Sequence, residues 1–539
     1  MTRRFLLLTM IISLAAALTP VSGGYSTAYA YGEGAVYDVP AGQYALVDEG
    51  TYNRFYNYVD GYSLPVDKAL TADMRYSSVC ATISNNNVRI QIFNQSLSGG
   101  VSRNSYQYYS NGFLKNSVDH FLEQQNYQVI SGHNVYVTRW YRNKLSRLAN
   151  DKNYYICFDI PSRAGEILTI FISSVQPIYL LGGFTHMIDG LQFFPKAAHG
   201  YIKKAAQTHP DSRDWSSETR AFYEEYFGAA SSLKWGIFEP SFPNSPFSIK
   251  GLEADLNYTF PIALNYTGID NKYMHPELES RLRLSHQEGK TLELTLQTLE
   301  AQAWESNQIY QILNGEYDEF LRQYANTVAA FRHPVLFRLG NEMNGDWCPY
   351  SGYNTSRDPS LYVEFYKYVY DFFKRAGANN VIWIWNPNGK SFPDFKWNNE
   401  LMYYPGDDFV DVIGMTLYNN GTYYKDEHWI EFNVLYDSIY YPYLGKYDKP
   451  LMITEFACSQ FGGDKHQWVI NMFNHIPYYD RIKVAVWWNG ADYDAEGNIA
   501  RPYFLNSPMS LIPIFRNGLN KIPQTRVIDN VSWKDEVFA

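Results

Sequence analysis

Two glutamates in the second half of the chain each follow an apolar segment. Glu342 comes three residues after Val335–Leu339, and Glu455 comes directly after Leu451–Thr454. Two facing carboxyl groups can cleave a glycosidic bond: one protonates the leaving oxygen, and the other, about 5–5.5 Å away in a retaining enzyme, attacks the anomeric carbon. A single Glu at a strand end is more often a solvated rim residue or a helix cap. The pair suggests a catalytic site, but spacing alone leaves both explanations open.

Polar residues accompany both glutamates and follow two other apolar segments. Arg338 and Asn341 precede the first glutamate, and Asn386 and Tyr418 each follow a further apolar segment. Tyr418 could donate a hydrogen bond to the nucleophile, and Asn341 could hold the sugar 2-hydroxyl, a contact that strengthens in the transition state. Arg338 and Asn386 could orient the carboxylates. We therefore place these four residues among the candidate substrate-binding residues.

The apolar segments predict the element that must position these side chains. Amphipathic segments separate several of them, at Pro276–Glu288, Tyr310–Phe331 and Leu361–Ala376. Alternating strands and helices indicate a parallel sheet, and eight such units predict a (β/α)₈ TIM barrel over 233–520, with its chemistry at the carboxyl ends of the strands. The eight predicted strands are Trp235–Phe238, Phe260–Leu264, Leu292–Leu296, Val335–Leu339, Val381–Trp385, Val410–Leu417, Leu451–Thr454 and Val484–Trp488.

The last predicted strand ends in two consecutive tryptophans, Trp487 and Trp488. Successive side chains of a strand point to opposite faces, so one of the two faces the barrel interior. We predict that Trp487 is a platform for a sugar ring. Trp383, inside a predicted strand, is expected in the core.

Residues 31–195 have a different pattern, which predicts a smaller mixed or β-rich N-terminal domain. Alternating segments predict strands at Val88–Phe93, Asn134–Thr138 and Glu166–Ile172, and a helical stretch is expected at Ser117–Gln125. No motif in this domain carries chemistry, so its role stays open. Residues 196–232 form a polar connector that ends in a helix capped by Ser216 or Ser217, and 521–539 form a C-terminal tail.

The first 30 residues have the pattern of a signal peptide. Arg3 and Arg4 are followed by the apolar run Phe5–Leu18 and by the cleavage-site pattern Ala28-Tyr29-Ala30. A membrane anchor is the alternative, but the run is short for a span of about 20 residues. We expect a secreted, extracellular protein with no membrane span after signal cleavage.

Four cysteines, Cys80, Cys157, Cys348 and Cys458, allow three pairings, and the sequence does not choose among them. Cys348 and Cys458 follow the two glutamates, so a bridge between them would stiffen the rim and leave Cys80 to pair with Cys157. Unpaired buried thiols are the equal alternative. Nothing resembles the spacing of a metal site, and no cofactor is indicated.

The composition excludes some partners. The 539 residues are 46% hydrophobic and 19% charged, with a net charge of −10, so disorder and nucleic-acid binding are not expected. Aromatic residues make up 17% of the chain, with 48 Tyr, 32 Phe and 13 Trp. Their flat apolar faces suit sugar rings, although they also serve as ordinary core. A polysaccharide substrate fits this composition, and nothing indicates the oligomeric state.

Two longer segments resemble a known family. The segment from Pro334 to Trp347, with the sequence PVLFRLGNEMNGDW, resembles the acid/base motif of glycoside hydrolase family 26. The segment PLMITEFA, from Pro450 to Ala457, is similar to the nucleophile strand of that family, and VIWIWNPN from Val381 is similar to its fifth strand. The resemblance covers about 233–515, a little over half of the chain.

The resemblance implies a clan A barrel and retaining chemistry, with Glu342 as acid/base and Glu455 as nucleophile. Trp347 matches a tryptophan that lines the cleft. Members are mostly endo-β-1,4-mannanases, and others cleave β-1,3-1,4-glucan or β-xylan. The chain departs from the family because Asn341 replaces the usual His, and because CPYSG follows Trp347 in place of an aromatic run. We expect a divergent, mannanase-like relative.

Two other functions stay in view. The barrel could be a non-catalytic carbohydrate-binding protein, but a binding protein has no need for both glutamates and Tyr418. Alternatively, residues 31–195 could carry the main function, such as wall attachment or glycan binding, with the barrel as an accessory.

Overall fold

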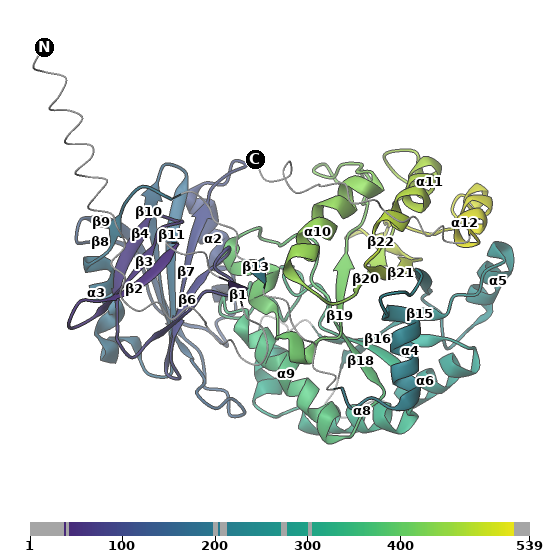
Figure 1. Cartoon of the computed structure of the whole chain (residues 1–539), viewed down its shortest axis with the longest axis horizontal. Helices are drawn as coiled ribbons and strands as arrows, with labels where there is room; N and C mark the ends of the chain where they lie inside the picture. The colour runs from purple at the N-terminus through teal and green to yellow at the C-terminus, as the bar shows by residue number, and fades with distance from the viewer. Residues whose placement is uncertain are drawn as a thin grey trace, which may run out of the picture.

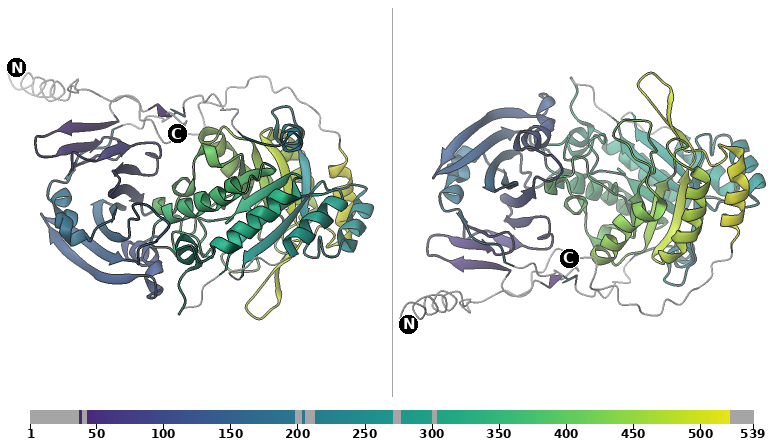
Figure 2. Two further views of the ribbon diagram at one scale, coloured as in Figure 1. Left: turned by 90° about the horizontal axis from the view of Figure 1, so that it is seen from below. Right: turned by 90° about the horizontal axis from the view of Figure 1, so that it is seen from above.

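The computed structural model describes residues 37–38, 43–197, 203–204, 213–270, 277–299 and 304–521. The predicted signal peptide and residues 522–539 of the predicted tail lie outside the described residues. Figure 1 shows two bodies along the long axis, a β-rich N-terminal body and a barrel. Figure 2 shows the same two bodies side by side from two further directions.

The N-terminal body is a sandwich of two antiparallel sheets. Ile90, Ile92, Ile170 and Ile172 alternate along two central strands and pack between the sheets, as period-two patterning requires. The seven-stranded sheet has the order β5 (Thr71–Asp73), β6 (Ala81–Ser84), β7 (Val88–Ser96), β11 (Glu166–Ser174), β10 (Tyr154–Arg163), β9 (His133–Tyr141) and β8 (Phe121–Ile130). The four-stranded sheet has the order β12 (Gln192–Phe193), β4 (Tyr62–Val66), β3 (Asn53–Asn57) and β2 (Tyr44–Asp48).

The predicted helix at Ser117–Gln125 is wrong. Most of that segment belongs to β8, an edge strand paired with β9, and the body's longest helix is α2 (Arg103–Ser110), among the described residues. Most β8 side chains are exposed, so the strand lacks an alternating apolar pattern that would identify it. The three strands predicted in this region are confirmed as parts of β7, β9 and β11. Two short helices, η2 (Ile178–Phe184) and α3 (Thr185–Asp189), pack on the sandwich.

The barrel is closed by eight parallel strands, as predicted, with the last strand paired to the first. Each predicted strand matches one in the structure, within a few residues. The strands are β14 (Lys234–Phe238), β15 (Ile262–Ile269), β16 (Thr291–Thr298), β17 (Val335–Leu339), β18 (Val381–Trp385), β19 (Val412–Thr416), β20 (Leu451–Phe456) and β21 (Ile482–Trp488).

Helices surround the barrel, and one predicted helix is divided. The segment Tyr310–Phe331 forms two helices because Gly315 adopts a left-handed conformation, with φ of 86°, between them. The helices are α5 (Phe247–Leu256), α6 (Glu277–Gln287), α7 (Gln308–Leu313), α8 (Asp318–Phe331), α9 (Ser360–Arg375), α10 (Phe432–Lys446), α11 (Lys465–His475) and α12 (Ile512–Leu519). The pair β22 (Ala491–Tyr493) and β23 (Ile499–Pro502) follows the last barrel strand, and β1 (Tyr37–Asp38) pairs with β13 (Lys203–Lys204).

The amino-terminal end of the barrel is closed by α4 (Ser217–Phe227). Ser216 caps this helix by accepting a hydrogen bond from the backbone N–H of Thr219 at 3.1 Å, as predicted. Phe227 joins the apolar side chains that fill the barrel interior, and the Trp215 indole donates to the carbonyl of Val381, the first residue of β18, at 2.9 Å. Helix α4 and the residue before its cap therefore cover the amino-terminal end of the barrel interior.

The N-terminal body contacts the loops that follow three barrel strands. After β16, the Tyr310 hydroxyl lies 2.8 Å from Nε2 of His120. After β17, Asp358 accepts a hydrogen bond from Arg89 at 2.7 Å. After β18, the Trp397 indole donates to Ser110 Oγ at 3.0 Å. These contacts place the N-terminal body against the end of the barrel at which the strands have their carboxyl ends.

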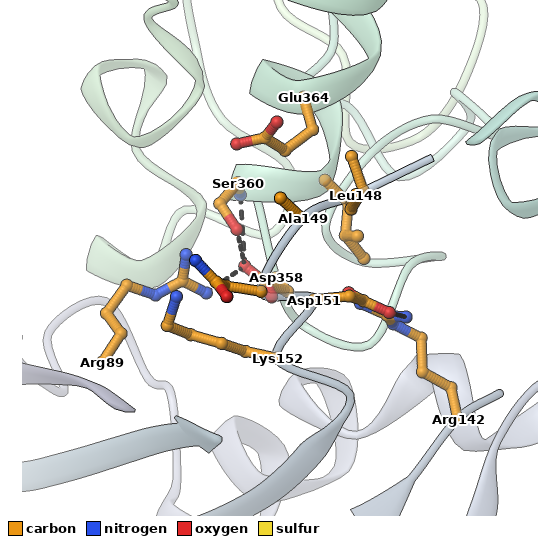
Figure 3. Close-up of a pocket in the computed structure, with 11 residues that line it drawn as sticks. Arg89, Arg142, Leu148, Ala149, Asp151, Lys152, Asp358, Ser360 and Glu364 are labelled. Carbon is orange, nitrogen blue, oxygen red and sulfur yellow. Dashed lines mark hydrogen bonds and ion pairs between the residues drawn. The ribbon is translucent and has the colours of Figure 1, made fainter. Parts of the chain in front are cut away.

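A cavity of about 260 Å³ lies at this junction and is lined by both bodies. Figure 3 shows Arg89 and Lys152 of the N-terminal body facing Asp358 and Glu364 of the barrel. Neither predicted catalytic glutamate lines it. Among the residues that the structure describes, no helix is long and apolar enough to cross a membrane.

Candidate active site

Glu455, near the end of β20, has both carboxylate oxygens held by hydrogen bonds. Arg338 Nη1 donates to Oε1 at 2.9 Å, and Asn341 Nδ2 donates to the same oxygen at 3.2 Å. The Tyr418 hydroxyl donates to Oε2 at 3.0 Å, and the Tyr266 hydroxyl donates to the same atom. The residue is only 4% exposed. One cation and three neutral donors therefore fix the orientation of this carboxylate and match its charge.

Arg338 lies directly beneath this carboxylate, in the barrel interior. Its Nε donates to Thr295 Oγ1 at 2.8 Å, and its Nη1 also donates to Asn386 Oδ1 at 2.9 Å. Arg338 and Asn386 are both 0% exposed. Their placement among the substrate-binding residues is therefore wrong, because a substrate cannot reach either side chain. Their contacts fit the second expectation, that they orient a carboxylate.

A third carboxyl group, Glu293 on β16, lies on the other side of Arg338. Its Oε1 is 3.3 Å from Arg338 Nε, and the side chain is fully buried. Burial, followed by the charge of Glu455, raises the pKa of Glu293 to about 8 despite the nearby guanidinium. Two buried carboxyl groups thus lie beside the single positive charge of Arg338. When Glu293 is protonated and neutral, the charge of Arg338 is balanced by that of Glu455 alone.

Glu342, just beyond the end of β17, has an uncommon backbone conformation. Its φ is 56°, in the left-handed region, and its N–H donates to the carbonyl of Asn386 at 2.7 Å. Such a conformation costs about 1–3 kcal/mol in a residue other than glycine and persists only where the surroundings enforce it. Burial raises the pKa of Glu342 to about 8, and the charge of Glu455 adds to the rise. Both effects favour the protonated form of this carboxyl group.

Asn341 contacts the nucleophile candidate and a residue that the sequence did not indicate. Its Oδ1 accepts a hydrogen bond from Gln297 Nε2 at 2.6 Å, while its Nδ2 donates to Glu455. The Tyr350 hydroxyl donates to its carbonyl oxygen at 2.6 Å. The amide is therefore fixed beside the carboxylate, where the predicted contact with a sugar 2-hydroxyl stays a proposal.

Aromatic rings lie beside the two glutamates. Trp347 is 51% exposed, hydrogen-bonds to Glu342 and has Phe392 beside it, with ring centroids 5.3 Å apart. On the opposite wall, Trp488 stacks on Phe238 at 5.0 Å between centroids. The Trp488 ring also lies 6.3 Å between centroids from the ring of Tyr418, which donates to Glu455, so aromatic rings lie near both carboxyl groups.

The prediction for Trp487 is wrong. Its side chain is 2% exposed, its indole donates to the Tyr503 carbonyl at 3.0 Å, and its ring packs against Phe515 of α12. On β21, Val484 and Val486 point into the barrel, so strand alternation places Trp488 on that face and Trp487 on the outer face. One of the two tryptophans does face the barrel interior, as strand alternation predicts, but it is Trp488.

The four cysteines are free and buried, so the disulfide alternative is not realised. The Cys348 thiol donates to the Asn341 carbonyl at 3.5 Å, and the Cys458 thiol donates to the Ser459 carbonyl at 3.3 Å. Burial raises the pKa of the Cys458 thiol to about 12, which leaves it protonated and poorly nucleophilic.

Tyr266, Gln297 and Glu293 are the main site residues that the sequence analysis missed. Tyr266 lies two residues beyond the predicted end of the second strand, so continued alternation would have placed it on the inward face beside Leu264. Glu293 was visible as a charged residue within a predicted apolar strand. Gln297 had no distinguishing signal. Within the described ranges, no group of three or more His, Cys, Asp and Glu side chains could hold a metal ion.

Comparisons with known proteins agree on the barrel region. Residues 289–473 match the family model described as Glycosyl hydrolase family 26. Endoglucanase H of Acetivibrio thermocellus is 31% identical over 190 residues, which cover 34% of this chain and 21% of that protein. A mannan endo-1,4-beta-mannosidase of Bacillus subtilis is 36% identical over 94 residues, covering 16% of this chain and 24% of that protein.

Among solved structures, the catalytic domain of the GH26 endo-beta-1,4-mannanase of Bacillus sp. JAMB-750 aligns with a TM-score of 0.44 and 19% identity, covering 57% of this chain and 91% of that one. The chain spans only about a fifth to a quarter of the length of the two curated relatives. Over its barrel region, the chain is therefore similar to glycosyl hydrolase family 26.

Proposed function

We propose that this protein is a retaining glycoside hydrolase that cleaves a β-linked polysaccharide by double displacement. The observation that supports this most is the difference between its two glutamates. Glu455 accepts hydrogen bonds from a cation and three neutral donors, whereas burial beside Glu455 raises the pKa of Glu342 to about 8. Two neighbouring carboxyl groups with such different environments suit the nucleophile and the acid of a retaining site.

In the first step, a carboxylate oxygen of Glu455 attacks the anomeric carbon and the glycosidic C–O bond breaks. Glu342 gives its proton to the leaving oxygen, so the departing sugar chain leaves as an alcohol. The product is a glycosyl ester of Glu455 with inverted configuration. Trp347, which hydrogen-bonds to Glu342 and is half exposed, supplies a ring against which a neighbouring sugar can stack.

In the second step, Glu342 acts as a base. It removes a proton from a water molecule, whose oxygen attacks the anomeric carbon and displaces the Glu455 carboxylate. The second inversion restores the original configuration, and Glu342 is protonated again for the next cycle. Arg338, Tyr266 and Tyr418 stay bonded to the carboxylate that leaves, so its regained charge is already matched.

Mannan is the first candidate substrate. Several curated relatives are named mannan endo-1,4-beta-mannosidases, so we propose endo-β-1,4-mannanase activity. A β-glucan is the second candidate, because the aligned stretch with the relative named endoglucanase H is about twice as long as that with either mannosidase of Bacillus subtilis. Asn341 replaces the family histidine beside the acid, which also favours testing sugars other than mannose. Secretion follows from the predicted signal peptide and belongs to the same proposal.

The test is hydrolysis of mannan, glucomannan, mixed-linkage β-glucan and xylan by the full chain and by Glu342→Gln and Glu455→Gln. We expect new reducing ends from at least one polymer with the parent protein. Each variant should lose at least about a hundredfold in kcat, because each removes a group that acts on the reacting atoms. Early products observed by NMR should have the anomeric configuration of the substrate.

Glu253→Gln is the matched control. Glu253 is a partly buried glutamate on the outer helix α5 that pairs with Lys290, so its replacement should leave hydrolysis unchanged. Near-parental hydrolysis by Glu342→Gln or Glu455→Gln would overturn the assignment. Binding of a polysaccharide without any new reducing ends would instead support a non-catalytic carbohydrate-binding protein.

A further inference from the structure

An exposed strip of aromatic rings leads from the candidate cleft onto the N-terminal body. We define the aromatic strip as Phe392, Trp347, Tyr353, Tyr109 and Tyr108. The first three belong to the barrel loops after β17 and β18, and the last two belong to α2. Tyr108 is 63% exposed and Tyr109 46%, compared with 51% for Trp347 and 40% for Phe392. Rings this exposed contribute little to the core.

The helix that carries the two outer tyrosines is fixed to the same loops. On its buried face, the Tyr106 ring packs edge-on against Phe395 with centroids 4.7 Å apart, and Arg357 donates to the Tyr106 hydroxyl at 2.8 Å. The Trp397 indole donates to Ser110 Oγ at 3.0 Å. Because α2 is attached to the loops that carry Trp347 and Phe392, the exposed rings of α2 have a fixed position relative to the cleft.

Tyr353 connects the two halves of the strip. Its ring packs so closely on Gly112, just beyond α2, that a Cβ on that glycine would lie 2.5 Å from the ring. The same side chain lies within electrostatic reach of Asp346, the neighbour of Trp347, and of both outer tyrosines. The strip therefore continues from the cleft, through Tyr353, to Tyr109 and Tyr108.

The two outer tyrosines present differently oriented ring faces. They are consecutive in a helix, so their side chains diverge by about 100° around its axis, and their rings meet at 78° with centroids 5.5 Å apart. The ammonium group of Lys115 lies 5.6 Å from the centre of the Tyr108 ring. Flat faces with hydroxyl tips and a nearby cationic donor suit a polyhydroxylated chain better than an apolar protein surface.

We propose that the outer end of this strip is a distal binding site for the polysaccharide chain whose cleavage takes place at Glu342 and Glu455. The N-terminal body would then contribute subsites to the cleft, a role that no comparison assigns to it. The occupant follows from continuity, because a chain held against Trp347 and leaving the cleft on that side meets Tyr353 and then α2. This inference rests on the proposed function.

The test uses the full chain with Tyr108→Ala and Tyr109→Ala combined. Hydrolysis is measured on soluble galactomannan and on mannotetraose, or on mixed-linkage β-glucan and its tetrasaccharide if those are what the parent cleaves. We expect KM for the polymer to rise roughly tenfold with kcat unchanged, because two stacking faces are lost. KM for the tetrasaccharide should change less than about twofold if, as we propose, its few sugar units bind near the two glutamates and do not extend to α2.

Two further variants separate this role from a structural one. Tyr108→Phe combined with Tyr109→Phe keeps both ring faces and should keep the parental KM for the polymer. Tyr179→Ala removes a tyrosine that is 64% exposed in η2, which packs on the sandwich core rather than against the barrel, and it should have no effect.

A parental KM for the polymer in the double alanine variant would overturn the inference, as would an equal rise for polymer and tetrasaccharide. If the parent chain cleaves no polysaccharide, the proposed function fails instead. The two failures are therefore distinguishable.

Discussion

Replacing Glu342 by Gln should remove the alkaline limb of the pH–rate profile. Burial and the charge of Glu455 raise the pKa of Glu342 from 4.5 to about 8. At pH 6 about 99% of such a group is protonated, compared with about 3% at the ordinary pKa, so the site gains roughly thirtyfold in the form that can protonate a leaving group. The protonated acid is the active form, so the alkaline limb of kcat/KM should begin near pH 8 and fall about tenfold per pH unit above it.

The assay compares two substrates. Polysaccharide hydrolysis needs the acid, so Glu342→Gln should lose about 10²- to 10⁴-fold in kcat/KM, and what remains should no longer decline above pH 8. A 2,4-dinitrophenyl β-glycoside of the cleaved sugar has a leaving group that needs little protonation. The first step on that substrate should therefore survive the substitution, and azide should accelerate the second step by replacing the water that Glu342 no longer activates.

Two results would refute this reasoning. If Glu342→Gln kept an alkaline limb near pH 8 on polysaccharide, another group would be responsible, and Glu293, whose pKa is also raised to about 8, would be the first candidate. If the substitution reduced kcat/KM, which reports the first step, equally for both substrates, Glu342 would not be the acid.

Three further predictions follow from the same geometry. Tyr266→Phe removes one donor to Glu455 and should lower kcat/KM about 10- to 100-fold, as a lost hydrogen bond to a charged group implies, and a parental rate would contradict its positioning role. Glu293→Gln should raise stability in urea more at pH 8.5 than at pH 5, and an equal gain at both pH values would count against a protonated Glu293. The sign follows because its folded pKa of about 8 exceeds the ordinary 4.5, so the wild type loses stability as the pH rises toward 8 while the Gln variant does not. Trp487→Ala should lower the free energy of unfolding by about 3–5 kcal/mol, because the side chain is buried, and should leave KM unchanged. A raised KM would instead support the original prediction that Trp487 is a platform for a sugar ring.

The barrel was predictable from the sequence because its signals are local and repeated. Each strand is a short apolar run, and the strand from Val381 to Trp385 is buried throughout, as parallel strands covered on both sides require. The two glutamates were selected because the carboxyl end of a barrel strand is where chemistry is expected, and their catalytic roles stay a proposal. By contrast, β8 was mistaken for a helix because pairing with β9, and not its own side chains, decides its conformation.

The remaining errors in the site concern how deep a side chain lies in the barrel and which way it points. Whether Arg338 contacts a substrate or lies beneath Glu455 depends on which layer of the barrel interior it occupies, and sequence spacing does not give the layer. A shift of one residue along a strand exchanges its inward and outward faces. The sequence therefore does not decide whether Trp487 or Trp488 points into the barrel. Gln297 bonds to Asn341 across neighbouring strands, a contact that only the barrel register creates.

The excess of aromatic residues has two physical origins: rings buried where the sandwich packs on the barrel, and rings left exposed on α2. Together they explain why a sandwich precedes the barrel. Trp140, Tyr155 and Phe171 form a stacked group on the face of the seven-stranded sheet turned toward the barrel loops, and the Tyr155 hydroxyl reaches Asp358 at 3.3 Å. A module tethered only to capture glycan would expose such a face. Here the face is buried in the same apolar cluster as Tyr350, whose hydroxyl donates to the carbonyl of Asn341, the residue before Glu342.

The loop that carries Glu342 and Trp347 is therefore packed against the N-terminal body at one end and continuous with the strand β17 at the other. Separate fragments would each expose this junction to water, which favours aggregation over independent folding. The left-handed backbone of Glu342 also needs surroundings that enforce it, and the loop packed on the N-terminal body supplies part of them. The N-terminal body thus forms one structural unit with the barrel, and under the proposed function the tyrosines left exposed on α2 are the ones available for substrate.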